Sequence, residues 1–151
     1  RALVRGGPRG VRPAVWASLR ATRAQVRRLA GPFRTLTAAA AAPWATVGIA
    51  GATAGSFDAA QGAVSGTTYI STGNNFADAL AAGPVAGING RMIVLSDTPT
   101  ALGAGIASYL GTKTVGASAT SPTQVGTLHA LGPTAAVSAE LMKTAAATIG
   151  R

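Results

Sequence analysis

The order strand, polar turn, helix, strand over residues 67–95 constrains the fold of this chain more than any other feature. Residues 67–71 (Thr-Thr-Tyr-Ile-Ser) have strand-forming side chains, and residues 92–95 (Met-Ile-Val-Leu) form a second apolar run. Between the two runs, Gly73-Asn74 predicts a turn in which a positive φ is cheap, and Asn75 can cap the helix that follows. This is the order of a βαβ unit, whose two strands run parallel.

The helix within this unit carries its own signals. Phe76 and Leu80 stand four apart and are expected to share one helix face, while Asp78 lies in the first turn, where the helix dipole favours an anion. Gly83-Pro84 is expected to weaken or kink the helix end.

The rest of the chain continues the alternation of strands and helices. The same signals predict a helix from Pro99 to Gly111 capped by Thr98, strands at 114–115 and 124–131, and a helix capped by Ser138 that ends before Gly150. Such alternation predicts the α/β class, with a mostly parallel sheet and flanking helices.

The formal charge of +9 is confined to one end of the chain. Nine arginines and no acidic residue precede residue 35, whereas the four basic residues after it are matched by four acidic ones. Residues 1–34 are therefore predicted to form a basic arm, disordered or helical, and residues 35–151 an electrically neutral domain. The arm could attract nucleic acid or an anionic membrane surface, or it could be a solvated tail. The neutral domain has no electrostatic footprint for nucleic acid.

Residues 35–55 carry no charge and follow a basic stretch, as the apolar region of a secretory signal does, and residues 52–54 (Ala-Thr-Ala) resemble a cleavage site. The segment is rich in alanine and contains Pro43. These features favour a buried helix and turn, followed by a strand at 46–49. The segment is too weakly apolar to predict a transmembrane span.

Groups suited to catalysis are few. The chain has no cysteine, one histidine and four carboxylates. His129 lies in a predicted strand among small or apolar residues, as a satisfied or edge histidine would, and Asp78 and Asp97 lack the spacing of a metal-binding pair. The turn at Gly73 lacks the Gly-x-x-x-x-Gly-Lys phosphate-binding pattern. We therefore expect no catalytic residues, no metal and no cofactor.

Residues 70–84 (Ile-Ser-Thr-Gly-Asn-Asn-Phe-Ala-Asp-Ala-Leu-Ala-Ala-Gly-Pro) closely resemble the signature Ala-Thr-Gly-x-Asn-Phe-x-Asp-Ala-Leu-Ala-Ala-Gly-Pro of the cell wall binding repeat 2 family, found in surface proteins of Gram-positive bacteria. Residues 92–95 resemble the family's Pro-Ile-Leu-Leu strand. Residues 131–138 resemble its Leu-Gly-Gly-Thr-Ala-Ala-Val-Ser block, with Pro133 in place of the second glycine. The blocks occur in the family's order.

The start of the repeat has two competing alignments. Residues 28–38 are similar to the family's opening Arg-Leu-Ala-Gly-Ala-Asp-Arg-Tyr-Ala-Thr-Ala, with Phe33 for the acid and Thr35 for the tyrosine. Residues 48–52 (Gly-Ile-Ala-Gly-Ala) offer a poorer alignment of the same block. The sequence therefore places the start between residues 28 and 55.

The resemblance implies a three-layer α/β repeat, similar to the Toprim fold in topology. It implies a non-catalytic module that anchors a secreted or surface protein by binding an anionic cell-wall polysaccharide. Family members carry several repeats packed together, so a homotrimer or neighbouring repeats are implied as partners. The alternative that the residues leave open is a basic-arm protein that binds nucleic acid or an anionic membrane surface.

For an anionic polymer, the sequence nominates three charges and three hydrogen-bonding residues at a helix N-terminus. The polymer-binding candidates are Arg91, Lys113, Lys143, Thr72, Asn74 and Asn75. Turn and cap roles compete with polymer binding for the last three residues.

Overall fold

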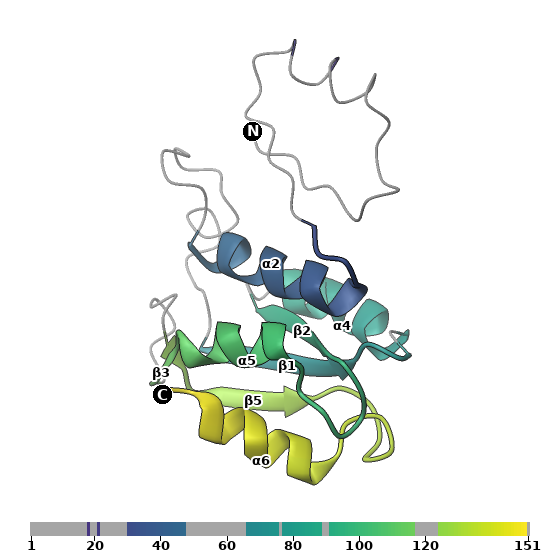
Figure 1. The fold of residues 1–151 in the computed structure, drawn as a ribbon, viewed down its shortest axis with the longest axis vertical. Helices are drawn as coiled ribbons and strands as arrows, with labels where there is room; N and C mark the ends of the chain where they lie inside the picture. Colours follow the sequence, from purple (N-terminus) through teal and green to yellow (C-terminus); the bar gives the residue numbers. More distant parts are fainter. Residues whose placement is uncertain are drawn as a thin grey trace.

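The computed structural model describes residues 18, 21, 30–47, 66–75, 77–88, 91–116 and 124–150. These residues form α2 (Arg34–Val47), β1 (Thr67–Thr72), α4 (Ala77–Ile88), β2 (Met92–Ser96), α5 (Ala104–Gly111), β3 (Thr114–Val115), β4 (Gln124–Val125), β5 (Thr127–Ala130) and α6 (Ala139–Thr148), as drawn in Figure 1. Most of the predicted basic arm lies outside the described residues, so its conformation stays a prediction.

The main sheet has the strand order β2-β1-β5, and both neighbours of β1 run parallel to it. The register places Tyr69 of β1 between Ile93 of β2 and His129 of β5. The short strands β3 and β4 form a separate parallel pair. The predicted α/β class with a mostly parallel sheet is confirmed.

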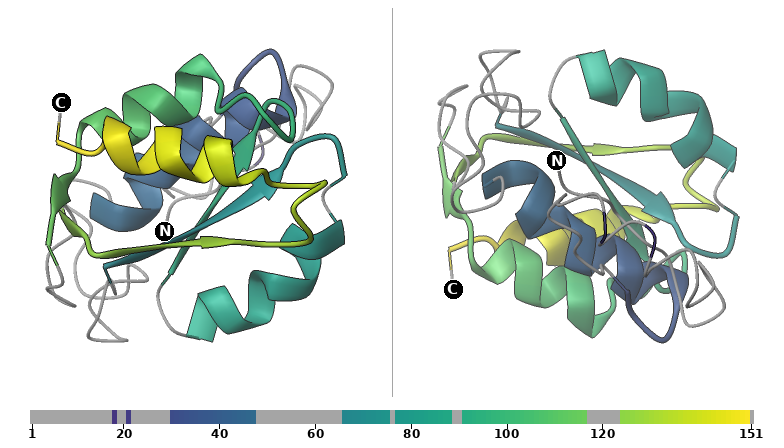
Figure 2. Two further views of the ribbon diagram at one scale, coloured as in Figure 1. Left: turned by 90° about the horizontal axis from the view of Figure 1, so that it is seen from below. Right: turned by 90° about the horizontal axis from the view of Figure 1, so that it is seen from above.

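Helices cover the two faces of the main sheet unequally. Figure 2 shows α2, α5 and α6 on one face and α4 on the other. Ile70 and Val94 point to the three-helix face, where both are fully buried in the hydrophobic core together with Ile106, Leu110 and Leu141. Since side chains alternate along a strand, Tyr69 points to the face that α4 flanks. The closer likeness to the Toprim topology stays a prediction.

The helix predicted from Pro99 begins five residues later, at Ala104. Thr98 closes a turn instead, because its Oγ1 accepts hydrogen bonds from the backbone N–H groups of Thr100 and Ala101 at 3.3 and 2.9 Å. Gly103 then adopts a φ of 85°, which a continuous α-helix cannot include. The predicted end at Gly111 is confirmed.

The single strand predicted at 124–131 is wrong, because the segment divides into β4 and β5, which belong to different sheets. Gly126 separates the two strands. Its N–H and that of Thr127 both donate to the carbonyl of Gly66, directly before β1. The chain thus leaves β4, the partner of β3, and enters β5, the partner of β1. Leu131 lies beyond the end of β5.

Two helices run further than the sequence predicted. Residues 46 and 47 belong to α2 and not to a strand. The helix propensity of this alanine-rich segment and the packing of the fully buried Ala42 outweigh the strand preference of the β-branched Thr46 and Val47. The rest of that predicted strand lies outside the described residues. Helix α4 continues through Gly83-Pro84 to Ile88. Pro84 has no N–H to donate to the carbonyl of Leu80, four residues earlier. Both residues are exposed, so water can donate a hydrogen bond to this carbonyl instead.

Candidate functional site

The turn after β1 holds its polar groups close to the backbone. Thr72 is only 1% exposed, and its Oγ1 accepts a hydrogen bond from the N–H of Asn74 at 3.2 Å. The N–H of Gly73 donates to the carbonyl of Ser96 at 2.7 Å. Gly73 is not one of the glycines with a positive φ, so the prediction that this turn uses a glycine for its positive φ is wrong. A Cβ at this position would lie 2.6 Å from Thr35 Cγ2, so close approach explains the glycine.

Asn75 contributes a weak cap to α4. Its Oδ1 accepts a hydrogen bond from the N–H of Ala77 at 3.4 Å, and both Asn74 and Asn75 are exposed. Asp78 lies in the first turn, as predicted. Phe76 lies outside the described residues, so the face it was expected to share with Leu80 stays a prediction. The Leu80 side chain itself is 67% exposed.

Arg91 lies at the opposite end of the sheet, directly before β2. Its Nη1 donates a hydrogen bond of 2.6 Å to the Tyr69 hydroxyl, and the guanidinium carbon lies 5.8 Å from the centre of the Tyr69 ring. The backbone N–H of Arg91 donates to the carbonyl of Ala86 near the end of α4. Arg91 Nε is buried and has no hydrogen-bond partner in the structure. The guanidinium group is therefore held in place by Tyr69, but at least one of its hydrogen-bond donors is unused.

His129 lies beside Tyr69 on the side of β1 opposite β2. It is the register partner of Tyr69, and the two ring centroids lie 5.6 Å apart with the ring planes at 36°. His129 is exposed, and β5 is an outer strand of the described three-stranded sheet. The predicted edge position of the histidine is confirmed.

Lys113 lies inside the domain rather than on its surface. It is 5% exposed, and its Nζ lies 4.6 Å from the centre of the Tyr109 ring. Desolvation by burial lowers the pKa of the Lys113 ammonium below its ordinary value. This lysine therefore presents little of its charge to a ligand in solution.

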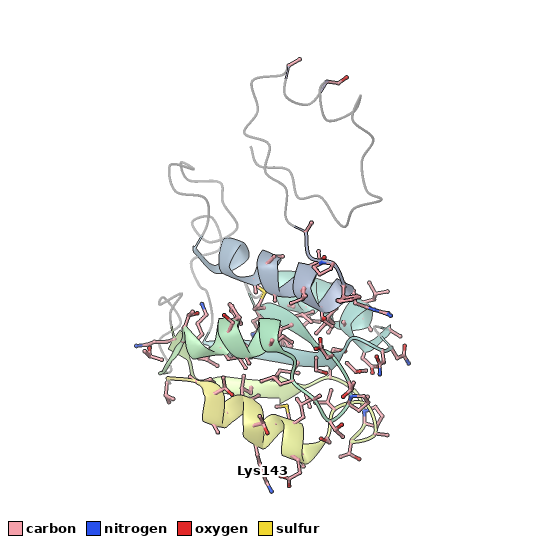
Figure 3. The ribbon with its side chains drawn as sticks, viewed as in Figure 1. Lys143 is labelled. Carbon is pink, nitrogen blue, oxygen red and sulfur yellow. The ribbon has the colours of Figure 1, made fainter. Side chains whose placement is uncertain are left out.

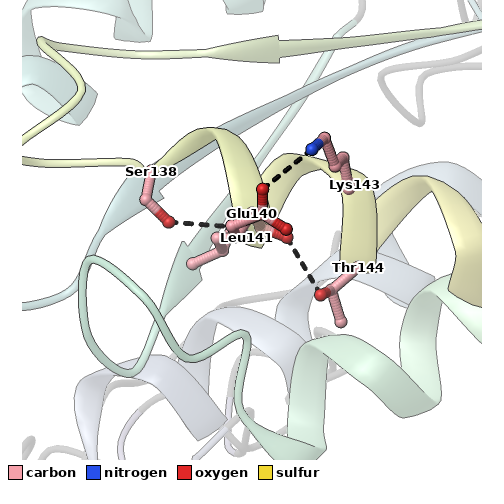
Figure 4. A network of polar contacts seen from close by, with 5 residues as sticks. All are labelled: Ser138, Glu140, Leu141, Lys143 and Thr144. Atoms are coloured by element: carbon pink, nitrogen blue, oxygen red, sulfur yellow. Dashed lines mark hydrogen bonds and ion pairs between the residues drawn. The ribbon is translucent and has the colours of Figure 1, made fainter.

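Lys143 projects from α6 into solvent (Figure 3). Its Nζ forms an ion pair of 2.8 Å with Glu140 Oε1, and the two side chains are 73% and 78% exposed. Figure 4 shows this pair beside Ser138, whose hydroxyl accepts a hydrogen bond from the N–H of Leu141 at 3.1 Å. The predicted cap at Ser138 is confirmed. Solvent exposure makes such an ion pair weak.

The structure does not gather the six nominated residues into one site. Thr72 ends β1, and Asn74 and Asn75 follow it. Arg91 lies at the other end of the sheet, Lys113 between α5 and β3, and Lys143 on α6. Sequence reasoning missed that Tyr69 and His129 accompany Arg91. Both residues occur in predicted strands, but only the pairing of β1 with β2 and β5 shows that Arg91 and His129 approach Tyr69 from its two sides.

Within the described ranges, no group of three His, Cys, Asp or Glu residues is placed to hold a metal ion. None of the helices in these ranges is long and apolar enough to cross a membrane.

Comparison with known families identifies the domain. The model of the family described as Cell wall binding domain 2 matches residues 28–142, which confirms the family that the signature at residues 70–84 indicated. No curated protein and no solved structure gives a significant match. Binding to cell walls is the role that defines this family, and the match covers most of the chain. The chain therefore belongs to the cell wall binding domain 2 family.

Proposed function

We propose that this chain is a non-catalytic module that anchors a secreted or surface protein of a Gram-positive bacterium by binding an anionic cell-wall polymer. The family match over residues 28–142 is the observation that carries the proposal. The same match supports the non-catalytic part of the proposal, because the matching family is a family of binding domains.

The exposure of the nominated residues indicates which of them can meet a polymer. Asn74, Asn75 and Lys143 are exposed, and Arg91 is partly exposed. Thr72 and Lys113 are buried, so we assign them supporting roles. Thr72 holds the backbone of Asn74, and Lys113 packs its ammonium against Tyr109. Polymer contacts are thus proposed for Arg91, Asn74, Asn75 and Lys143.

The outer face of α4 supports the proposal that the repeat works beside further repeats or copies of itself. Positions i, i+3, i+4, i+7 and i+8 of a helix lie on one face. In α4 this face is exposed and consists of Ala77, Leu80, Ala81, Pro84 and Val85. Leu80 and Val85 are 67% and 53% exposed, and an exposed apolar patch of this kind is typical of a protein interface.

Retention on purified Gram-positive cell walls tests the proposed function. We expect the intact chain to sediment with walls that keep their anionic polymers and to stay in solution with walls from which these polymers have been extracted. Equal retention on both preparations would contradict binding to an anionic polymer.

The nine arginines before residue 35 support a second candidate, in which the basic arm itself binds anionic surfaces or nucleic acid. A variant with the arginines before residue 28 replaced by glutamine separates the candidates. Attraction by the arm predicts that wall retention falls steeply with salt and is lost in this variant. Binding by the repeat predicts that the variant stays on the walls.

A further inference from the structure

We propose that Tyr69, Arg91 and His129 form a binding site for a sugar that carries a phosphate or a carboxylate. The proposal rests on the proposed function, since it locates the place where one unit of an anionic wall polymer binds. Tyr69 and His129 come from the paired strands β1 and β5, and Arg91 directly precedes β2. Tyr69 lies on the sheet face that α4 flanks, where Arg91 and His129 contact it.

The three side chains form a continuous group around Tyr69. Arg91 Nη1 donates to the tyrosine hydroxyl at 2.6 Å, and the His129 ring centre lies 5.6 Å from the tyrosine ring centre. His129 is exposed, while Tyr69 and Arg91 are partly exposed. A ligand can therefore reach the group without opening the core, which lies on the other face of the sheet.

The charge of Arg91 has no carboxylate partner within the part of the chain that the structure describes. Glu140 is paired with Lys143. The other two described acids lie near the opposite ends of the strands, Asp78 close to Gly132 and Asp97 close to Gly103. The guanidinium group carries five N–H donors, and its hydrogen bond to the Tyr69 hydroxyl uses one of them. A partly buried cation without a counter-ion among the described residues favours binding of an anion.

The aromatic residues supply the second half of the recognition. Tyr69 and His129 offer flat apolar faces with polar edges, which suit the apolar C–H face of a sugar ring and its hydroxyl groups. The Tyr69 hydroxyl accepts its hydrogen bond from Arg91, so its own hydrogen is available to donate to the ligand. A guanidinium group beside aromatic rings thus fits a sugar phosphate or a uronic acid better than either a neutral sugar or a free anion.

Nuclear magnetic resonance of the intact chain can test this site directly, because His129 is the chain's single histidine and its imidazole signals report on one place. Glucose 1-phosphate, glucuronate, glucose and inorganic phosphate serve as separate probes. We expect saturable shifts of the His129 signals with at least one charged sugar, at an affinity about tenfold or more above those of glucose and inorganic phosphate. Comparing the affinities for glucose 1-phosphate and for glucuronate shows whether the site recognises a phosphate or a carboxylate.

Two charge-matched variants decide the role of Arg91. Arg91→Gln is expected to lower the affinity for the charged sugar about tenfold or more. Arg34→Gln, which removes an equally positive charge from the exposed start of α2 on the other face of the sheet, is expected to leave this affinity unchanged. If Arg91→Gln does not fold, Arg91→Lys keeps the charge but loses the planar fork and should weaken binding.

Unchanged His129 signals with both charged sugars, or equal affinities of the Arg91 variant and the parent chain, would overturn the proposed site. If the chain is nevertheless retained on walls through their anionic polymers, the wall-binding function stands and only this site is wrong. If retention also fails, the wall-binding function is wrong as well.

Discussion

Gly73 and Thr35 meet where β1 ends beside the first turn of α2. A Cβ atom on Gly73 would lie 2.6 Å from Thr35 Cγ2 and 2.7 Å from the carbonyl oxygen of Ser96. Both contacts are far shorter than a carbon atom tolerates, and one of them is with backbone. The family signature therefore contains a glycine whose role is to let the strand end, the helix and β2 approach one another.

Gly73→Ala is expected to destabilise the domain by about 1–3 kcal/mol, because the added methyl group must displace backbone. Urea unfolding followed by circular dichroism measures the change. Gly83→Ala is the matched control, since a Cβ on Gly83 of α4 meets nothing within 4 Å. The control should be neutral or raise stability by up to about 1 kcal/mol. Equal effects of the two substitutions would refute the packing role of Gly73.

The two helix caps should differ in strength. Ser138→Ala is expected to cost about 1 kcal/mol of unfolding free energy, because the serine hydroxyl accepts a well-formed hydrogen bond at 3.1 Å. Asn75→Ala should cost less, since its hydrogen bond to Ala77 is 3.4 Å long. Thermal melting of both variants gives the comparison. A large loss of wall binding by Asn75→Ala with unchanged melting would show that this asparagine contacts the polymer.

Lys113 predicts a pH dependence of stability. Burial lowers its pKa in the folded state below the ordinary value of 10.5, so the unfolded chain binds more protons in the range between the two values. Stability supplied by this residue therefore rises with pH through the folded-state pKa and levels off near 10.5. Relative to Lys113→Met, the parent chain should gain stability as the pH rises toward this value. A difference that is constant with pH, or that falls, would contradict the desolvation of Lys113.

The apolar outer face of α4 predicts self-association or binding to a neighbouring repeat. Leu80→Glu should lower any self-association of the chain, because it places a charge in the middle of this face. Sedimentation velocity at several protein concentrations measures the mass. A mass distribution that Leu80→Glu does not change would exclude this face as a contact between copies. Lys143→Gln on α6 controls for the change in net charge, because it also lowers the charge by one unit at an exposed position.

Local signals were sufficient for much of the fold. The strands around residues 67–72 and 92–96 follow from their apolar and β-branched side chains, and the cap at Ser138 follows from its position before an apolar periodic run. The βαβ unit combines such signals, so its parallel pairing could be predicted. The late start of α5 could not, because the turn at Thr98 and the positive φ of Gly103 satisfy the same sequence pattern as a longer helix.

The candidate site depended on information that local patterns do not contain. Arg91 could be nominated by its charge, but its contact with Tyr69 and the approach of His129 require β5 to pair with β1 across a long sequence separation. The burial of Lys113 likewise depends on the packing of Tyr109. Charge in the sequence therefore identified candidate residues, and only strand register showed which of them share a surface.

Competition between bound walls and free polymer tests the central claim most directly. The intact chain is first loaded on Gram-positive walls, and anionic polymer extracted from the same walls is then titrated in, with a neutral polysaccharide of similar length as the control. Specific binding predicts saturable displacement by the anionic polymer alone, unchanged when the arginines before residue 28 are replaced by glutamine. Equal displacement by the neutral polysaccharide, or none by the anionic polymer, would contradict an anionic wall polymer as the ligand.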